Sequence, residues 1–302
     1  MGTDLAITVE GLVKRFGTFA AVDGLDLAVR TGEVHGFLGP NGAGKSTTIR
    51  VLLGLYRSTA GRVRVLDLDP SARAAEVTRR ISYVPGEVNL WPGLTGQEVL
   101  DALAGLRGAR NAAAERRLAA DFALDTRKRV RAYSKGNRQK VILVAAFAAE
   151  TDLLILDEPT SGLDPLMEDV FQRCVREAAA AGRTVLLSSH ILAEVEQLCE
   201  AVTIIKDGRL VESGRLADMR HLAASTITAR LAPAQLSGLG AEFASIGIPV
   251  PEVPDRELRL SVPRDRVPAV LGVLARADAQ DITCTPARLE DLFLRHYEVA
   301  AR

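Results

Sequence analysis

Gly39-Pro40-Asn41-Gly42-Ala43-Gly44-Lys45-Ser46, followed by Thr47, is the stretch that decides the fold of this chain. It matches the pattern G-x-x-x-x-G-K-[ST] of a phosphate-binding loop. The apolar run Val34–Leu38 precedes it and predicts a buried strand, and residues 47–55 predict a helix that follows it. A strand, a glycine-rich turn and a helix in this order distinguish a binding site from a chance turn.

Each part of the loop has a physical reason to bind phosphate. Its glycines allow a tight turn that aims backbone N–H groups inward as an anion nest. The helix N-terminus adds about half a positive charge. Lys45 brings a full positive charge to the β- and γ-phosphates, and Ser46 offers its hydroxyl to Mg²⁺. The loop therefore predicts binding of a nucleoside triphosphate.

Composition limits the classes of function. The chain has 302 residues, with 38 basic and 38 acidic side chains and a net charge of zero. It has no electrostatic footprint for nucleic acid, so we expect no nucleic-acid partner. Three scattered cysteines without a C-x-x-C pattern predict free thiols in a reducing compartment.

Apolar runs in the chain are too short for a membrane span. The longest, Val141–Ala149, is about half of what a bilayer needs. The first residues contain no basic and then apolar leader, so we expect no secretory signal. These features predict a soluble, cytoplasmic chain, which leaves docking on a membrane protein open.

Strands and helices alternate through the first two thirds of the chain. Alternating apolar and polar residues predict several strands, and an Asp207-Gly208 turn predicts a hairpin. From about Glu87 to Glu150 the sequence becomes rich in Ala, Leu and Arg and predicts a helical insertion. Thr95 and Glu98 predict a capping box that opens one of its helices. Residues 202–211 form the predicted hairpin, and the other predicted strands are 6–9, 24–29, 61–66, 81–85, 153–156 and 183–187.

Two carboxylates, Asp157 and Glu158, follow the apolar strand 153–156. The carboxyl ends of parallel strands are where α/β sheets bind ligands. Asp157 is suited to hold hydrated Mg²⁺ opposite Ser46. Glu158 is suited to polarise an attacking water.

Five further residues have two interpretations from local sequence alone. Phe16, beside a glycine, either stacks on a nucleobase or packs into the core. Ser134 and Gly136 precede an apolar helix and form either a second anion-binding end or a simple cap. Asp164 precedes another helix and is suited to cap it. His190 follows a strand and either reaches a γ-phosphate or is structural.

The organisation changes near residue 220. Residues 226–231, 257–262 and 281–285 predict strands, and apolar residues between 267 and 274 recur at helical spacing. Thr285 and a following proline predict the start of a last helix. The end of the chain is thus a small α+β unit without a catalytic constellation.

Together these motifs resemble the ATP-binding cassette (ABC) ATPases over about residues 5–220, because six motifs occur in that family's order. The resemblance implies an α/β phosphate-loop cassette at 1–220 with a helical subdomain at about 87–150, plus a small α+β domain at 221–302. It implies ATP and Mg²⁺ as cofactors. By resemblance, the ATP-binding residues are Phe16, Gly39, Pro40, Asn41, Gly42, Ala43, Gly44, Lys45, Ser46 and Thr47. The contacts to ATP of the opposite subunit are Ser134, Lys135, Gly136, Asn137 and Asp164, the metal ligands are Ser46 and Asp157, and the catalytic residues are Glu158, His190 and Lys45.

This sequence departs from the family pattern at two places. A glutamine that touches the metal in the family is replaced by Gly86, and we hypothesise that Glu87 or a water takes its part. The family's signature reads Leu-Ser-Gly-Gly-Gln, whereas residues 133–137 read Tyr-Ser-Lys-Gly-Asn. Lys135 therefore either adds a phosphate contact or faces water.

The appended domain and residues 289–293 resemble the drug-export branch, which includes ATPases of daunorubicin-, bacitracin- and tetronasin-type resistance transporters. The resemblance implies the ATP-hydrolysing subunit of a drug or antibiotic exporter, paired with a second cassette as a homodimer. It implies docking through the region near 87–106 onto a separate permease, at the cytoplasmic face of the membrane. Three alternatives stay open: a soluble cassette ATPase acting on ribosomes or DNA, a module that binds ATP without turnover, and an importer ATPase.

Overall fold

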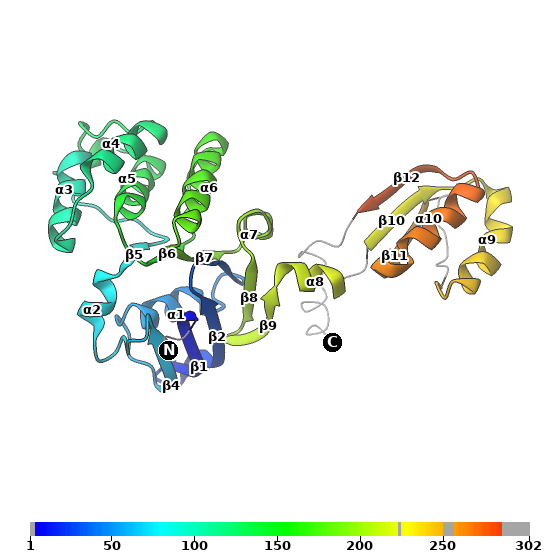
Figure 1. Cartoon of the computed structure of the whole chain (residues 1–302), viewed down its shortest axis with the longest axis horizontal. Coiled ribbons are helices and arrows are strands. Elements are labelled where there is room, and N and C mark those ends of the chain that lie inside the picture. Colours follow the sequence, from blue (N-terminus) through cyan, green and yellow to red (C-terminus); the bar gives the residue numbers. More distant parts are fainter. Residues whose placement is uncertain (1–3, 223–224, 250–256, 286–302) are drawn as a thin grey trace. The chain divides into compact units, whose positions relative to one another are not determined.

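The computed structural model of the chain describes residues 4–222, 225–249 and 257–285 (Figure 1). These residues form two compact units, Met1–Gly214 and Arg215–Arg302. Sequence analysis placed this boundary slightly later, at 220.

The first unit is built on a six-stranded sheet in the order β5-β6-β7-β3-β8-β9. The pairs β5–β6, β6–β7, β7–β3 and β3–β8 are parallel, so the carboxyl ends of these strands meet at one edge. Asp207 and Gly208 turn the chain between β8 and β9 with φ of 50° and 75°, which confirms the predicted hairpin. The strands are β3 (Val34–Leu38), β5 (Ile81–Val84), β6 (Leu153–Asp157), β7 (Thr184–Ser189), β8 (Ala201–Lys206) and β9 (Arg209–Arg215).

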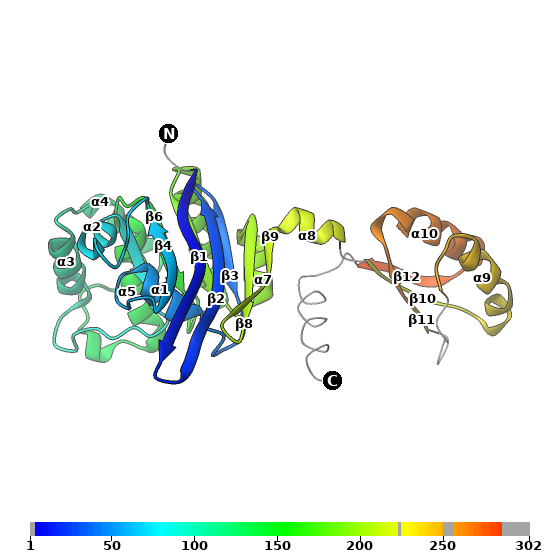
Figure 2. The same cartoon turned by 90° about the horizontal axis from the view of Figure 1, so that it is seen from below.

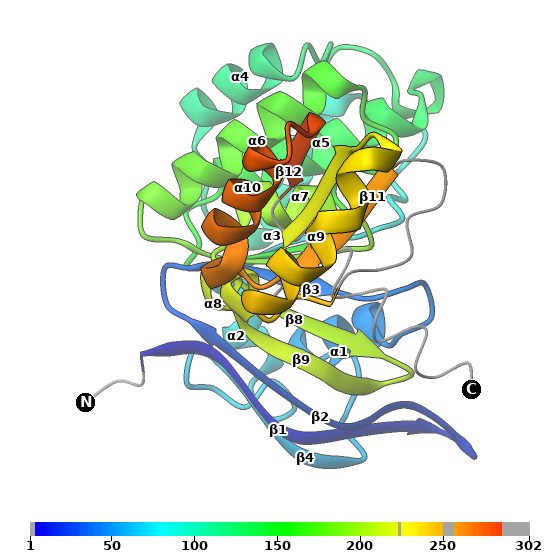
Figure 3. The same cartoon turned by 90° about the vertical axis from the view of Figure 1, so that its right-hand side faces the viewer.

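A second, antiparallel sheet of three strands has the order β2-β1-β4 and forms a separate layer (Figures 2 and 3). Its strands are β1 (Leu5–Phe16), β2 (Phe19–Arg30) and β4 (Ala60–Val65). β1 and β2 are longer than predicted, because register shifts around Gly11 interrupt the alternation of apolar and polar residues. Helix α1 (Lys45–Leu52) shares one apolar core with residues of both sheets, including Ile7, Phe37 and Ile49.

Helices cover the other side of the six-stranded sheet. The insertion consists of α3 (Gly96–Arg107), α4 (Ala112–Asp121) and α5 (Lys135–Ala148). The predicted capping box of Thr95 and Glu98 is present at the start of α3. A short helix, α2 (Ala74–Arg79), was not predicted because its six residues are too few to establish a helical period. Helices α6 (Pro165–Ala180) and α7 (Leu192–Leu198) pack against β7 of the sheet.

The second unit starts with α8 (Leu216–Leu222) and has its own sheet in the order β11-β10-β12. Its strands β10 (Ser225–Arg230), β11 (Glu257–Val262) and β12 (Gln280–Thr285) were predicted, as was α10 (Val267–Arg276). Helix α9 (Pro233–Ser245) was missed, because two glycines inside it weaken the helical signal. The predicted last helix and residues 289–293 lie outside the described residues.

Among the described residues, no helix combines the length and the apolar composition that crossing a bilayer requires.

Candidate nucleotide-binding site

A cavity of about 340 Å³ lies at the phosphate-binding loop. Glycine is required at two positions of this loop, because a Cβ at Gly39 would lie 2.5 Å from the Ile205 carbonyl oxygen, and one at Gly44 would lie 2.6 Å from that of Ala21. Gly44 also has φ of 103° and precedes α1 without a side-chain cap, which leaves the helix N-terminus open to an anion. The cavity is lined by Phe19, Ala21, Asn41, Gly42, Gly44, Lys45, Ser46, Thr47 and Glu158.

Lys45 is buried at the floor of the loop. Its Nζ donates to the carbonyl oxygens of Gly39 at 2.6 Å and Pro40 at 3.1 Å. Burial lowers the pKa of Lys45, and the carboxylates of Glu158 and Asp157 oppose this effect. A triphosphate in the cavity would supply further negative charge to this ammonium group.

The carboxylate of Glu158 lies between the side chains of Lys45 and His190. Its Oε1 is 3.7 Å from Lys45 Nζ and 3.3 Å from His190 Nδ1. The three residues predicted to be catalytic therefore gather at one point. They do so because β3, β7 and β6 lie side by side and all end at this edge.

Asp157 is 4% exposed, and its Oδ1 accepts a hydrogen bond of 2.8 Å from Ser188 Oγ. Ser188 is not among the residues predicted from sequence, because its role depends on the pairing of Asp157 with Ser188 across β6 and β7. No described residues form a group of three or more His, Cys, Asp or Glu suited to a metal ion. A magnesium ion held by one or two protein oxygens plus phosphates and waters needs no such group, so Asp157 and Ser46 fit it.

Position 86 borders this acidic side chain. A Cβ at Gly86 would lie 3.4 Å from the Asp157 carbonyl oxygen and 3.9 Å from its Cγ. Glu87 is exposed and forms no hydrogen bond or ion pair in the part of the chain that is described. Its role at the metal stays a hypothesis.

The residues expected to contact the opposite subunit's ATP do not line the cavity. Ser134 caps α5 by accepting from Asn137 N at 3.2 Å, and Asp164 caps α6 by accepting from Met167 N at 3.1 Å. Lys135 Nζ donates to Ser161 Oγ at 2.7 Å, so this side chain is engaged within its own chain and does not line the phosphate-loop cavity.

Two aromatic residues lie opposite each other on the β1–β2 hairpin. Phe16 is 44% exposed, so it is not a core residue, and its ring packs edge-on against Tyr56 with Lys14 Nζ 4.7 Å from its centroid. Phe19 is 66% exposed and lines the cavity, whereas Phe16 does not. Sequence analysis missed Phe19, although it flanks the same turn as Phe16.

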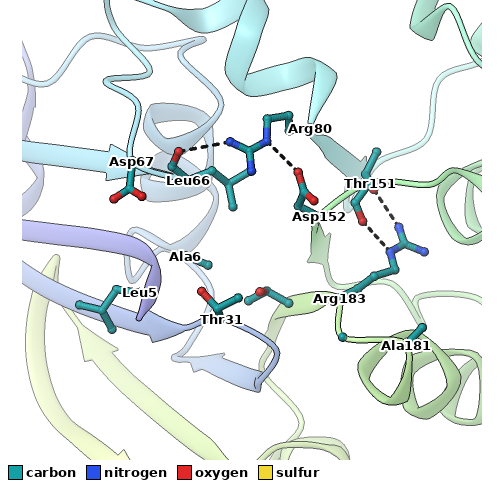
Figure 4. Close-up of a pocket in the computed structure, with 12 residues that line it drawn as sticks. Leu5, Ala6, Thr31, Leu66, Asp67, Arg80, Thr151, Asp152, Ala181 and Arg183 are labelled. Atoms are coloured by element: carbon teal, nitrogen blue, oxygen red, sulfur yellow. Dashed lines mark hydrogen bonds and ion pairs between the residues drawn. The ribbon is translucent and has the colours of Figure 1, made fainter. Parts of the chain in front are cut away.

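A second cavity, of about 280 Å³, lies at the opposite, amino-terminal edge of β6 and β7 (Figure 4). Arg80 crosses it to bind Asp152 at 2.7 Å, and Arg183 Nε donates to the Thr151 carbonyl at 2.8 Å. Arg183 also donates to the carbonyls of Ala146 and Phe147 and so caps the end of α5. Burial lowers the pKa of Arg183 to about 10, with a smaller contribution from the charge of Arg107.

Comparisons with known proteins agree with this site. A family model described as "ABC transporter" matches residues 22–161, and one described as "AAA domain, putative AbiEii toxin, Type IV TA system" matches residues 129–196. The chain is 37% identical to the daunorubicin resistance ATP-binding protein DrrA3 of Streptomyces coeruleorubidus, over 96% of this chain and 95% of that protein.

Two solved structures share the fold. One, titled as the ATP-binding subunit of an ABC transporter, is 32% identical with a TM-score of 0.67 over 72% of this chain and 92% of that chain. The other is a dimeric ATP-binding cassette in a post-hydrolysis state bound to ADP and Pi. It is 24% identical, with a TM-score of 0.62 over 70% of this chain and 98% of that chain. These likenesses confirm the predicted fold class.

The phosphate loop, the Glu158 cluster and these relatives lead to one conclusion. The chain belongs to the ABC transporter family, as one of its ATP-binding and ATP-hydrolysing cassettes.

Proposed function

We propose that this chain powers the export of a drug or antibiotic through a separate membrane permease. The observation that carries the ATPase part is the placement of Glu158 between Lys45 and His190, at the mouth of the phosphate-loop cavity. The export part is supported by the similarity to a daunorubicin resistance protein over nearly the whole of both chains.

In this proposal the phosphate loop holds the triphosphate, and Lys45 neutralises charge on its β- and γ-phosphates. Glu158 accepts the proton of the attacking water while His190 stabilises charge that develops on the γ-phosphate. Ser46 and Asp157 would hold Mg²⁺, which would supply further compensation of phosphate charge. Ser188 keeps Asp157 in place through its hydrogen bond of 2.8 Å.

The proposal includes a head-to-tail homodimer. Ser134, Lys135, Gly136, Asn137 and Asp164 would contact ATP held by the second copy. Their absence from the lining of their own cavity supports this role, as does the dimeric state of the solved cassette bound to ADP and Pi.

We place the chain at the cytoplasmic face of the membrane, with the region near 87–106 docked on the permease. Two large apolar side chains support this surface, because Trp91 is 50% exposed and Leu106 is 81% exposed. No nucleic acid takes part in the proposed function.

Capture of partners from native membranes tests the proposal. A tagged Glu158→Gln chain is expected to retain ATP without hydrolysing it and to co-purify with a multi-span membrane protein at a fixed ratio. Lys45→Ala is the matched control, because it weakens nucleotide binding and should lose any partner whose binding depends on ATP. Recovery of ribosomes or DNA-repair factors instead would favour a soluble ATPase, and a partner with a substrate-binding subunit would favour an importer.

A further inference from the structure

One carboxylate outside the predicted site bridges the two loops that carry Glu158 and His190. Glu194 lies in the first turn of α7, and its Oε1 accepts a hydrogen bond of 2.6 Å from Thr160 Oγ1. Its Oε2 accepts one of 2.8 Å from Ser189 Oγ. Thr160 is two residues after Glu158, and Ser189 immediately precedes His190, so each oxygen holds one catalytic loop.

The surroundings of Glu194 favour this use of both oxygens. The N-cap of α7, Ile191, has no side chain that can cap the helix, and a carboxylate in the first turn is stabilised by the helix dipole. Within the described residues Glu194 forms no ion pair with a basic side chain, and its two carboxylate oxygens accept from the two hydroxyls. Hydrogen bonds from hydroxyls to a carboxylate are about twice as strong as neutral ones.

The two loops need such a restraint. Glu158 has φ of 47°, a left-handed conformation that a non-glycine residue keeps only where its neighbours enforce it. The bond from Ser161 N to Glu158 O at 3.2 Å closes the turn that contains Thr160, and Leu163 N donates to Thr160 O at 2.9 Å. On the other loop, Ser189 Oγ also accepts from Ile191 N at 2.9 Å, so it links Glu194 to the backbone on the far side of His190.

We propose that Glu194 is a positioning residue that keeps Glu158 and His190 in register for hydrolysis. This inference rests on the roles proposed for those two residues. In this role Glu194 does not contact the nucleotide, and it acts through Thr160 and Ser189. Because a displacement of about 1 Å in a reacting group costs up to about 10²-fold in rate, loss of the bridge should affect turnover before it affects binding.

Steady-state ATP hydrolysis by the full chain tests the proposal. We expect Glu194→Leu to lower kcat about tenfold with KM within about twofold of wild type. Glu194→Gln should retain kcat within about threefold, because its amide can accept from one hydroxyl and donate to the other. Glu168→Gln is the matched control. Burial, and then the nearby charge of Glu194, raises the pKa of Glu168, so this variant removes a neighbouring carboxylate and leaves the bridge intact.

The single-arm variants Thr160→Val and Ser189→Ala keep the test decisive if Glu194→Leu fails to fold. Each alone should lower kcat with KM within about twofold of wild type. Where Glu194→Leu folds, combining either with it should add little, because the same bridge is already broken. A KM raised about tenfold with kcat unchanged would overturn the proposal, since it would make Glu194 a nucleotide-binding residue.

Hydrogen exchange in the nucleotide-free chain separates this inference from the proposed function. Glu194→Leu should speed exchange at the amides of Leu163 and Ile191, and Glu168→Gln should not. Unchanged exchange together with unchanged kcat would refute the bridge. Faster exchange with no difference in turnover would instead refute the roles given to Glu158 and His190.

Discussion

Glu158 combines a strained backbone with contacts to Lys45 and His190, so its carboxylate has a defined place. Its N–H donates to the Ser188 carbonyl at 3.0 Å, and the left-handed turn that follows aims the side chain at Lys45 and His190. A residue in this arrangement is suited to take a proton from a water between it and a bound phosphate.

Replacing this base should therefore abolish turnover and spare binding. Glu158→Gln should lower kcat by about 10²–10⁴-fold, because the amide keeps the size of the side chain but cannot accept the proton. The measurements are phosphate release and ATP affinity, with the exposed Glu10→Gln as control. A kcat within about threefold of wild type would show that another group is the base.

Substitutions of Phe16 and Phe19 test which of the two aromatic rings stacks on the nucleobase. The role proposed for Phe16 predicts that Phe16→Ala raises the Kd for ATP at least about fivefold, since stacking on a base is worth about 1–3 kcal/mol. Phe16→Tyr should bind ATP as the wild type does. If Phe19→Ala costs more affinity than Phe16→Ala in equilibrium binding, the role moves to Phe19, which lines the cavity.

A network of polar side chains at the amino-terminal end of β3 makes stability depend on pH. Glu33 Oε1 accepts from Arg30 N and lies 2.9 Å from His35 Nδ1, and His35 Nε2 lies 2.9 Å from Thr203 Oγ1. Burial alone would raise the pKa of Glu33, but the hydrogen bonds and the charges of His35 and Arg30 outweigh it, so this pKa is lowered.

A lowered pKa in the folded state gives stability that is complete above the unfolded value and is lost as the pH falls through the folded value. We expect Glu33→Gln to be less stable than wild type by about 1 kcal/mol near neutral pH. The difference should shrink below about pH 4.5. Urea unfolding of both proteins at pH 7, 5 and 4 measures it, and a constant difference would contradict the role of the Glu33 charge.

At the scale of elements, burial decides what could be predicted from sequence. β3, β6 and β7 are buried throughout, so their unbroken apolar runs were recognised nearly to their ends. The predicted strands 6–9 and 24–29 are shorter than β1 and β2, because bulges shift the alternation of apolar and polar residues. The same full burial hides the register, because both faces are apolar, so the pairing of Asp157 with Ser188 could not be read from the pattern.

Helix α5 contacts the loop after Glu158 at several points. Lys135 Nζ donates to Ser161 Oγ, Gln139 Nε2 donates to the Pro159 carbonyl at 2.9 Å, and a Cβ at Gly136 would meet the Gly162 carbonyl at 2.4 Å. Lys135, which the family pattern would make a glycine, thus adds a bond to a loop that the helix already touches.

That bond predicts a specific coupling. Lys135→Met and Ser161→Ala should each lower kcat about two- to tenfold, since one hydrogen bond is worth about 0.5–1.5 kcal/mol. The double variant should be no worse than the poorer single variant, because both remove the same bond. Additive losses would mean that Lys135 also acts apart from this bond, as its proposed contact with ATP of a second subunit would require. Lys128→Met, on an exposed lysine of the same insertion, is the control.

At the scale of the whole molecule, the two units have separate cores. The core of the first surrounds Phe37 and Ile49, and that of the second surrounds Phe243 and Leu274, with no residue in common. No described residue of Arg215–Arg302 lines the phosphate-loop cavity. The nucleotide chemistry should therefore belong to the first unit alone, whatever the second contributes to assembly.

A chain ending at Leu222, which keeps β9 whole, tests this division. It should bind ATP with a Kd within about twofold of the full chain, because every proposed ATP contact within one chain precedes Gly214 and the core around Phe37 stays complete. Isothermal titration of both chains gives the comparison, and Lys45→Ala in the short chain shows that any binding occurs at the phosphate loop. A Kd raised about tenfold in a short chain that still unfolds cooperatively would mean that the second unit shapes the site itself, because loss of folding could not then explain the weaker binding.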